Sequence, residues 1–264
     1  MKELLHPRHR SALARFVGEG APAKVLLAFD YDGVLAPLYT GDPAGNRMRP
    51  RTRELLARLG RHYPVAVVSG RAWRDVDRFV DGAVQTVVGN HGFELGHARR
   101  VPARVLALVR GWRLRLEREL AGVPGVYFED KRSTLAIHYG LDRAVRRSER
   151  QVYEAANRLE GTRLIPGKKV LNVLPHDFPS KGDAVRTLLA RQGLEAALYV
   201  GDDVTDEDAF AVGPPLVFGV HVGKGPSLAP WRLEDQGEVD ELLELLVAAR
   251  APAARAPVSG GRRR

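Results

Sequence analysis

The chain has 264 residues and a hydrophobic content of 44%, which is enough for one large domain with a packed core or for a domain with a sizeable insertion. It contains no cysteine, which excludes disulfides, thiolate metal ligands and a cysteine nucleophile, so any metal would be bound by oxygen or imidazole ligands. The formal net charge is +9, but residues 1–10 carry +2 and residues 251–264 carry +4, which leaves a mildly basic body of +3.

The two ends of the chain carry no signal for secretion. No stretch has the length and apolarity of a signal peptide or a membrane span, so we expect a cytoplasmic monomer without a membrane partner. Residues 1–20 are expected to form an N-terminal extension. Residues 251–264 consist mainly of Ala, Pro, Gly and Arg without periodicity, which predicts a disordered basic tail. Such a tail either contacts nucleic acid non-specifically or only keeps the protein in solution, and we expect no specific nucleic-acid partner.

Residues 21–100 and 175–250 have the pattern of an open parallel sheet covered by helices. Short aliphatic runs predict strands, and segments with apolar residues at three-to-four spacing predict helices between them. The expected strands are residues 25–29, 65–68, 83–88, 196–200 and 216–220, and the expected helices are residues 51–59, 72–80, 181–191, 206–211 and 240–249. Because right-handed crossovers join neighbouring strands, these units predict an α/β fold.

Residues 101–174 follow a different pattern. The expected order is helix 103–120, strands 126–129 and 134–139, helix 143–159, and strands 162–166 and 169–174. Turn residues such as Gly-Val-Pro-Gly at 122–125 separate these elements. The block therefore predicts a second, antiparallel α+β domain inserted into the first.

Two aspartates, Asp30 and Asp32, directly follow the first apolar run. Residues two apart on an extended chain point to the same side, about 7 Å apart, so both carboxylates are expected to face one site. Gly33 then allows the backbone to leave the strand sharply. Two like charges this close favour a divalent cation between them, although Asp is also common where a strand ends in a turn.

Polar residues follow other predicted strands and begin other predicted helices. Ser69 ends the second strand and precedes a helix, so its hydroxyl and nearby N–H groups suit either an ordinary N-cap or a phosphoryl oxygen. Ser180 and Asp183 are spaced like a capping box at the start of helix 181–191. Lys181 lies in the first turn, where a cation opposes the helix dipole, which favours a role in neutralising an anion over a lysine that reaches into solvent.

An acidic loop, residues 201–208, follows the predicted strand 196–200. Glu207 and Asp208 fall in the first turn of the next helix, where acids are stabilised by its dipole. Asp202 and Asp203 precede that helix and are better suited to a metal. Residues 89–92, Gly-Asn-His-Gly, end the third strand and by themselves indicate a turn with a surface histidine.

Taken together, these segments resemble the motifs of the haloacid dehalogenase superfamily of phosphotransferases, in the same order along the chain. Five segments are similar to those of trehalose-6-phosphate phosphatases: residues 69–71, 89–92, 129–133 with His138, 167–170 and 201–210. The resemblance spans about residues 25–220. It implies a Rossmann-like catalytic core, residues 21–100 and 175–250, with an inserted α+β (C2-type) cap domain, residues 101–174.

The resemblance also implies a two-step hydrolysis of a small sugar phosphate through an aspartyl phosphate. Asp30 is the expected nucleophile. Asp32 is expected to protonate the leaving oxygen and then to deprotonate the attacking water. Ser69, Gly70 and Lys181 are the expected phosphate-binding residues.

Mg²⁺ is the cofactor that the resemblance implies. Its expected protein ligands are the carboxylates of Asp30 and Asp202 and the backbone carbonyl of Asp32, consistent with the oxygen ligands that Mg²⁺ prefers. Asp203 and Asp206 are expected to orient metal-bound waters or Lys181.

Substrate recognition is expected to involve the inserted block and the loops that face it. The expected substrate-binding residues are Arg71, Asn90, His91, Gly92, Glu129, Lys131, Ser133, His138, Lys168 and Asn172. Cross-strand ion pairs on a solvated sheet are the alternative interpretation for the charged members of the block. Asn172 stands where the family usually has a glutamate that binds the glucose unit, and Leu174 stands where an arginine is common.

The leading hypothesis is a Mg²⁺-dependent phosphatase that hydrolyses trehalose 6-phosphate. The same chemistry on one or several other sugar phosphates, such as sucrose 6-phosphate or mannosyl-3-phosphoglycerate, is the main alternative, and a mutase would instead transfer the phosphoryl group to a second sugar. A non-catalytic polyanion-binding protein is the alternative from another class, and the intact acidic motifs and Lys181 argue against it.

Overall fold

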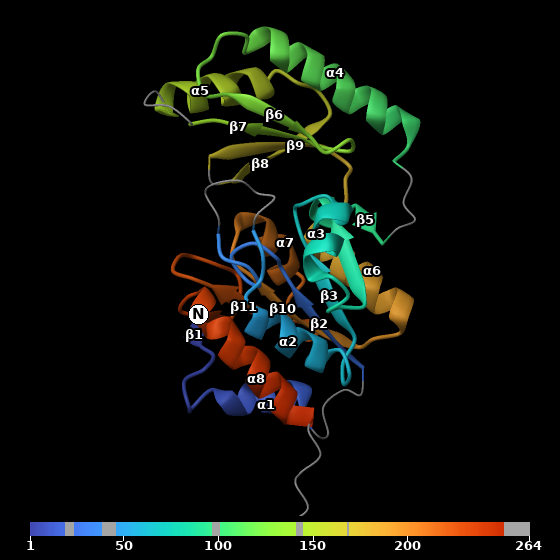
Figure 1. The fold of residues 1–264 in the computed structure, drawn as a ribbon, viewed down its shortest axis with the longest axis vertical. Coiled ribbons are helices and arrows are strands. Elements are labelled where there is room, and N and C mark those ends of the chain that lie inside the picture. The colour runs from blue at the N-terminus through green and yellow to red at the C-terminus, as the bar shows by residue number, and fades with distance from the viewer. Residues whose placement is uncertain (19–23, 39–45, 97–100, 141–144, 168, 251–264) are drawn as a thin grey trace, which may run out of the picture.

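The computed structural model describes residues 1–18, 24–38, 46–96, 101–140, 145–167 and 169–250. Its larger sheet has eight strands, parallel except for the last one (Figure 1). In the order in which they lie across the sheet, the strands are β1 (Lys2–Glu3), β12 (Trp231–Leu233), β11 (Val217–Val222), β10 (Ala196–Gly201), β2 (Val25–Phe29), β3 (Val65–Val68), β4 (Thr86–Gly89) and β5 (Glu94–Leu95).

The central strand β2 is buried on both faces, which explains why its sequence is a continuous apolar run. Val25, Leu27 and Phe29 pack into one core cluster, whereas Leu26 and Ala28 pack into the other. This alternation is what a parallel strand between two helical layers requires.

Helices cover both faces of the larger sheet. The first face is covered by α1 (Arg10–Val17), α2 (Pro50–Leu59), α3 (Trp73–Val80) and α8 (Val239–Arg250), whose apolar residues share the cluster of Leu27 and Phe29. The second face is covered by α6 (Lys181–Gln192) and the short α7 (Glu207–Phe210). The short turns η2 (Asn90–Gly92), η3 (Val204–Asp206) and η4 (Gln236–Glu238) complete the core.

The second sheet has four antiparallel strands and lies above the first in Figure 1. Across the sheet they are β6 (Tyr127–Asp130), β7 (Leu135–His138), β9 (Val170–Pro175) and β8 (Thr162–Gly167). The helices α4 (Ala103–Glu119) and α5 (Val145–Ala156) cover the side that faces away from the larger sheet (Figure 1). The opposite side of this sheet therefore faces the core.

The predicted fold class is confirmed: a parallel-sheet α/β core carries an α+β unit. Some boundaries differ. β4 begins at Thr86 because the N–H of Ala83 still bonds to the carbonyl of Val80 in the turn after α3. The expected helix 206–211 is a short turn followed by α7.

The expected N-terminal extension, where the structure describes it, contributes β1 and α1 to the core. β1 pairs with β12, and α1 buries Leu13 and Val17 in the core. Two residues in β1 and an eight-residue helix give too weak a pattern for recognition from the sequence. The expected basic tail, residues 251–264, lies outside the described residues. Across the part of the chain that the structure describes, every helix is too short or too polar to span a lipid bilayer.

The packing of α4 leads to a stability prediction. Leu116 is 0% exposed in the core of the four-stranded unit, whereas Leu114 on the same helix is 54% exposed. We expect Leu116→Ala to lower the free energy of unfolding by about 2–5 kcal/mol, because it removes buried methyl groups and leaves a cavity. Leu114→Ala is expected to change it by less than about 0.5 kcal/mol. Urea unfolding of both variants measures the two changes in the free energy of unfolding. Equal losses of stability would contradict the burial of Leu116 and the exposure of Leu114.

Candidate active site

The site lies at the carboxyl ends of the two central strands, β2 and β10, which pair in parallel with Phe29 opposite Val200. Asp30 follows β2, and its N–H donates to the carbonyl of Val200 over 2.8 Å. Asp202 follows β10 and comes close to the turn after Asp30. Gly33 makes this approach possible, since it has a φ of +78° and a Cβ at this position would collide with the Asp202 carboxylate.

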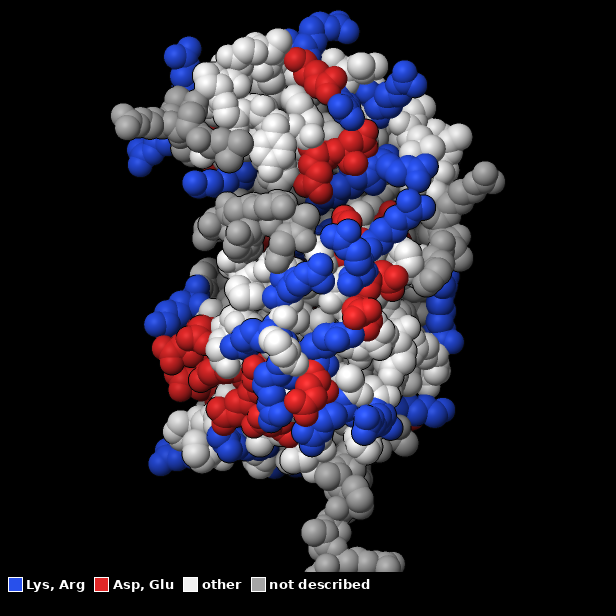
Figure 2. All heavy atoms as spheres, viewed as in Figure 1, with Lys and Arg blue, Asp and Glu red and all other residues white. Residues whose placement is uncertain are grey.

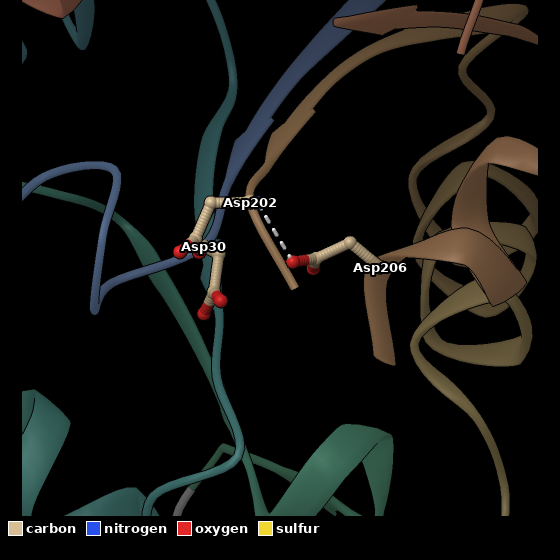
Figure 3. Close-up of side chains that lie close together, drawn as sticks. All are labelled: Asp30, Asp202 and Asp206. Carbon is tan, nitrogen blue, oxygen red and sulfur yellow. Dashed lines mark hydrogen bonds between the residues drawn. The ribbon is translucent and has the colours of Figure 1, made fainter. Parts of the chain in front are cut away.

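Three carboxylates converge at this point. Asp30, Asp202 and Asp206 each offer an oxygen atom, and these atoms lie within 4.8 Å of one another (Figure 3). Asp30 is only 5% exposed and Asp206 is fully buried. Three acids cannot all ionise at such distances in a buried site without a compensating positive charge.

Lys181 supplies one such charge. Its Nζ lies 2.9 Å from Oδ2 of Asp30 and 2.8 Å from Oδ1 of Asp206, and the residue is 1% exposed. The predicted capping box of α6 is confirmed: Ser180 and Asp183 bond reciprocally and fix the first turn. The helix start therefore aims Lys181 at the two acids.

Asp206 holds the acidic loop together. Tyr199 donates to its Oδ1 over 2.6 Å, and the N–H groups of Asp202 and Asp203 donate to its Oδ2 over 3.0 Å each. Gly201 must be glycine here, because a Cβ would collide with the Asp206 carboxylate. With both oxygens occupied by donors, Asp206 positions Lys181 and the loop that carries Asp202.

Burial and charge shift the protonation of these groups. Burial raises the pKa of Asp30 well above its ordinary value, although Lys181 acts in the opposite direction. Burial and the Asp206 charge raise the pKa of Asp202 to about 8. Burial disfavours the Lys181 ammonium, but Asp206 and Asp30 outweigh this effect and raise its pKa. At neutral pH the cluster therefore binds protons that a cation would displace.

The donor set fits a hard divalent cation. Oδ1 of Asp202 is buried and has no hydrogen-bond partner among the described residues, whereas the Asp206 oxygens are already engaged. An orphaned buried carboxylate oxygen is costly unless a ligand satisfies it. The oxygen-only donors match the preference of Mg²⁺ or a similar ion.

Asp32 lies apart from this cluster. Nε and Nη2 of Arg71 donate to its two carboxylate oxygens over 2.6 Å each, and Nδ2 of Asn46 donates over 2.8 Å. The third acid beside Asp30 and Asp202 is Asp206. After burial and the Asp206 charge, Asp32 also contributes to the raised pKa of Asp202, and that Asp30 and Asp32 serve one site stays a prediction.

The remaining core residues of the predicted site lie around the cluster. Ser69 is buried, and its Oγ accepts a bond from the N–H of Arg71. Gly70 packs against the ring of His91 so closely that a Cβ would collide with it. Asp203 is exposed and caps the following turn by accepting from Val204.

Several predicted substrate-binding residues lie on the strands of the smaller sheet or in the turn after β6, and Glu129, Lys131 and His138 form one group. Glu129 on β6 pairs with His138 on β7 over 2.9 Å, and the ring of Tyr127 stacks on His138. This bond from His138 lowers the pKa of Glu129, assisted by the charge of Lys131. Lys131 extends toward the core, where its Nζ donates to the carbonyl of Gly70 over 3.2 Å. The group therefore links the smaller sheet to the loop of residues 69–71.

Other predicted substrate-binding residues make their contacts with neighbouring residues of the chain. Asn90 and Ser133 are buried and bond to each other over 3.0 Å. Gly92 packs against the carbonyl of Ser180, with a φ of +113°. Asn172 is almost buried and donates to the carbonyl of Ile165. Lys168 lies outside the described residues.

His91 is a buried histidine and not the surface residue that its turn motif alone indicates. Burial, with the positive charges of Lys131, Lys181 and Arg163, lowers its pKa well below the usual value. The ring is therefore neutral at pH 7.

Sequence reasoning missed Asn46 and Tyr199. Asn46 reaches Asp32 from 14 residues away along the chain, so no local pattern predicts the contact. Tyr199 lies within an apolar strand, where only its hydroxyl sets it apart from its neighbours. A buried tyrosine needs a hydrogen-bond partner, and here that partner is Asp206.

Comparison with known proteins places the chain in a family. The model of the trehalose-phosphatase family matches residues 28–236. A probable trehalose-phosphate phosphatase 3 of Oryza sativa is 31% identical over 91% of this chain and 75% of its own length. A trehalose-phosphate phosphatase of Mycobacterium marinum is 33% identical over 81% of this chain and 57% of its own length.

Solved structures share the fold. The C-terminal domain of a C. albicans trehalose-6-phosphate phosphatase superposes with a TM-score of 0.76 at 22% identity, covering 90% of this chain and 96% of that one. A HAD subclass IIB sugar phosphatase, BT4131, superposes with a TM-score of 0.56 at 13% identity, covering 83% and 97%. The family match over most of the chain, with the relatives above 30% identity, establishes that the chain belongs to the trehalose-phosphatase family of phosphoric monoester hydrolases.

Proposed function

We propose that this protein hydrolyses trehalose 6-phosphate to trehalose and phosphate through an aspartyl phosphate on Asp30. The observation that carries the proposal is the position of Lys181, whose Nζ lies 2.9 Å from Asp30 beside the buried acidic cluster. Phosphoryl transfer depends mainly on positioning and on neutralising charge, and this pair supplies both. The names of the relatives support the choice of substrate.

Asp30 is held for attack by two donors. The N–H of Tyr31 donates to Oδ1 over 2.6 Å, and Lys181 lies beside Oδ2. In the first step, a carboxylate oxygen of Asp30 bonds to phosphorus while the bond from phosphorus to the sugar oxygen breaks. Lys181 offsets the charge of the transferring group, and the Ser69 loop faces it from the next strand.

Asp32 is proposed as the acid and base. It gives a proton to the leaving sugar oxygen and then takes one from the water that hydrolyses the aspartyl phosphate. Arg71 donates to both of its oxygens, so this contact must open before either oxygen can reach the leaving group.

Mg²⁺ is the proposed cofactor, held by the carboxylates of Asp30 and Asp202 and the backbone carbonyl of Asp32. When bound, this cation stabilises negative charge on the transferring phosphoryl group. Asp203 and Asp206 are proposed to act without binding the cation directly. Asp206 accepts hydrogen bonds from Lys181 and from the N–H of Asp202 and so positions both residues.

Residues 101–174 are proposed to act as a cap domain that selects the sugar. Glu129, Lys131 and His138 offer charged and polar groups on the sheet that faces the core. On the face seen in Figure 2, Lys and Arg side chains gather where the two sheets meet, which favours an anionic substrate. A cytoplasmic monomer without a nucleic-acid partner remains our prediction.

The substrate and the cofactor are tested together on a panel of phosphosugars. We expect trehalose 6-phosphate to give the highest kcat/KM, above sucrose 6-phosphate and mannosyl-3-phosphoglycerate, and we expect EDTA to abolish phosphate release until excess Mg²⁺ is added. Comparable turnover of several phosphosugars would contradict specificity for trehalose 6-phosphate and indicate a phosphatase of broad substrate range. Full activity in EDTA would exclude the metal.

The nucleophile is tested by Asp30→Asn. The amide keeps the shape of the side chain but cannot attack phosphorus, so we expect kcat to fall by at least about 10³-fold. Asp81→Asn is a matched control on the exposed Arg53–Asp81 pair and is expected to leave turnover unchanged. Near-normal turnover by a folded Asp30→Asn protein would disprove the assignment.

The pKa of Asp202 predicts how cation binding depends on pH. Because the folded chain releases this proton only near pH 8, whereas the unfolded chain releases it near pH 4, the metal-free protein loses stability as the pH rises from 4 to 8. Mg²⁺ must displace the proton below pH 8, so its stabilising effect should be larger at pH 8.5 than at pH 6.5. Thermal unfolding with MgCl₂ or EDTA measures this difference.

Asp202→Asn is the control for this measurement and is expected to abolish the shift in Tm on adding MgCl₂. An equal shift at both pH values, or a shift that persists in Asp202→Asn, would contradict the prediction.

A further inference from the structure

Asn90 occupies the junction between the two sheets. It belongs to the core, directly after β4, but its side chain is fully buried against the turn between β6 and β7 of the cap. Its Nδ2 donates to Oγ of Ser133 over 3.0 Å and to the carbonyl of Lys131 over 3.5 Å, and its Oδ1 accepts from Oγ1 of Thr134 over 3.3 Å. Both the N–H donor group and the oxygen acceptor of the Asn90 amide are therefore hydrogen-bonded to residues of the cap.

The backbone around Asn90 is tied to the loop that carries the core chemistry. The N–H of Asn90 donates to the carbonyl of Arg71 over 2.7 Å, and the N–H of His91 donates to the carbonyl of Ser69 over 3.0 Å. Asn90 has a φ of +45°, a left-handed conformation that asparagine tolerates better than most residues. This conformation turns the side chain toward the cap while the backbone remains on the core.

The cap turn that Asn90 holds lies next to the proposed sugar-binding groups. Glu129 is the last residue but one of β6, opposite Ala136, and Lys131 is the first residue of the turn. Lys131 reaches back to Gly70 in the same core loop that Asn90 contacts. One residue therefore connects the Ser69–Arg71 loop with the turn beside Glu129 and Lys131.

We infer that Asn90 is a positioning residue that sets where the cap's sugar-binding side chains lie relative to Asp30 and Asp32. The inference rests on the proposed function, because it assumes that the cap binds the sugar. Asn90, Ser133 and Thr134 are each at most 1% exposed, and their polar atoms satisfy one another. They therefore act on the cap and not on the substrate, which revises the role first predicted for Asn90 and Ser133.

The test compares two substrates in each variant. The first is the phosphosugar that the wild-type protein hydrolyses best, and the second is p-nitrophenyl phosphate, which has no sugar for the cap to hold. We expect Asn90→Ala to lower the ratio of the two kcat/KM values at least tenfold and Thr134→Val to lower it about fivefold. In the double variant Asn90→Ala/Ser133→Ala, the ratio should fall no further than in Asn90→Ala, because both substitutions remove the same hydrogen bond between Asn90 and Ser133.

Ser148→Ala is the matched control. Ser148 is equally buried within the cap, and its Oγ donates to the carbonyl of Pro124 over 2.9 Å; it lies on α5, on the side of the cap sheet that faces away from the core (Figure 1). This variant removes a buried hydroxyl but leaves the junction intact, so the ratio should remain within twofold of wild type. Thermal unfolding reports whether each variant is folded, and if Asn90→Ala does not fold, Thr134→Val provides the test.

An unchanged ratio in folded Asn90→Ala or Thr134→Val would overturn the inference, as would an equal loss in Ser148→Ala. A loss in Asn90→Ala that Thr134→Val does not share would also overturn it, because it would indicate direct contact of Asn90 with substrate. A wild-type protein that hydrolyses p-nitrophenyl phosphate but none of the sugar phosphates would refute the proposed function instead, independently of the variants.

Discussion

The ammonium of Lys181 lies within hydrogen-bond distance of both Asp30 and Asp206 and is almost completely shielded from water. A buried charge is tolerated only when it is paired, and removing one partner of such a pair costs about 3–5 kcal/mol. Here the pairing joins three elements: the end of β2, the start of α6 and the loop after β10. The acidic site and the local fold are therefore stabilised by the same contacts.

This arrangement also separates the roles of the aspartates. Asp206 accepts four hydrogen bonds and has no oxygen to spare, whereas Asp202 has a buried oxygen without a partner. Asp30 lies between Lys181 and this open position. Residues of one type thus differ in chemistry because their donors differ, and the sequence spacing alone does not distinguish them.

The positions of Asp30, Asp202 and Lys181 were predictable because strand ends in a parallel sheet meet at one edge, and because a capping box marks where α6 begins. The contact between Arg71 and Asp32 was not predictable, since it joins residues 39 positions apart through side chains alone. The contact of Asn90 with the turn between β6 and β7 was equally inaccessible, because it depends on how the two sheets are placed relative to each other. Short elements such as β1 carry too few residues for a pattern.

The close packing of Gly92 against Ser180 has a consequence for how such a molecule can be built. Gly92 shortly precedes the inserted block and Ser180 shortly follows it, so the polypeptide leaves the core beside the point of its return. A long excursion between neighbouring points adds little loop-closure entropy to the cost of folding the core. The insertion can therefore change in length or be exchanged while the larger sheet keeps its geometry. Substrate specificity can then change without any change in the residues at the ends of β2 and β10.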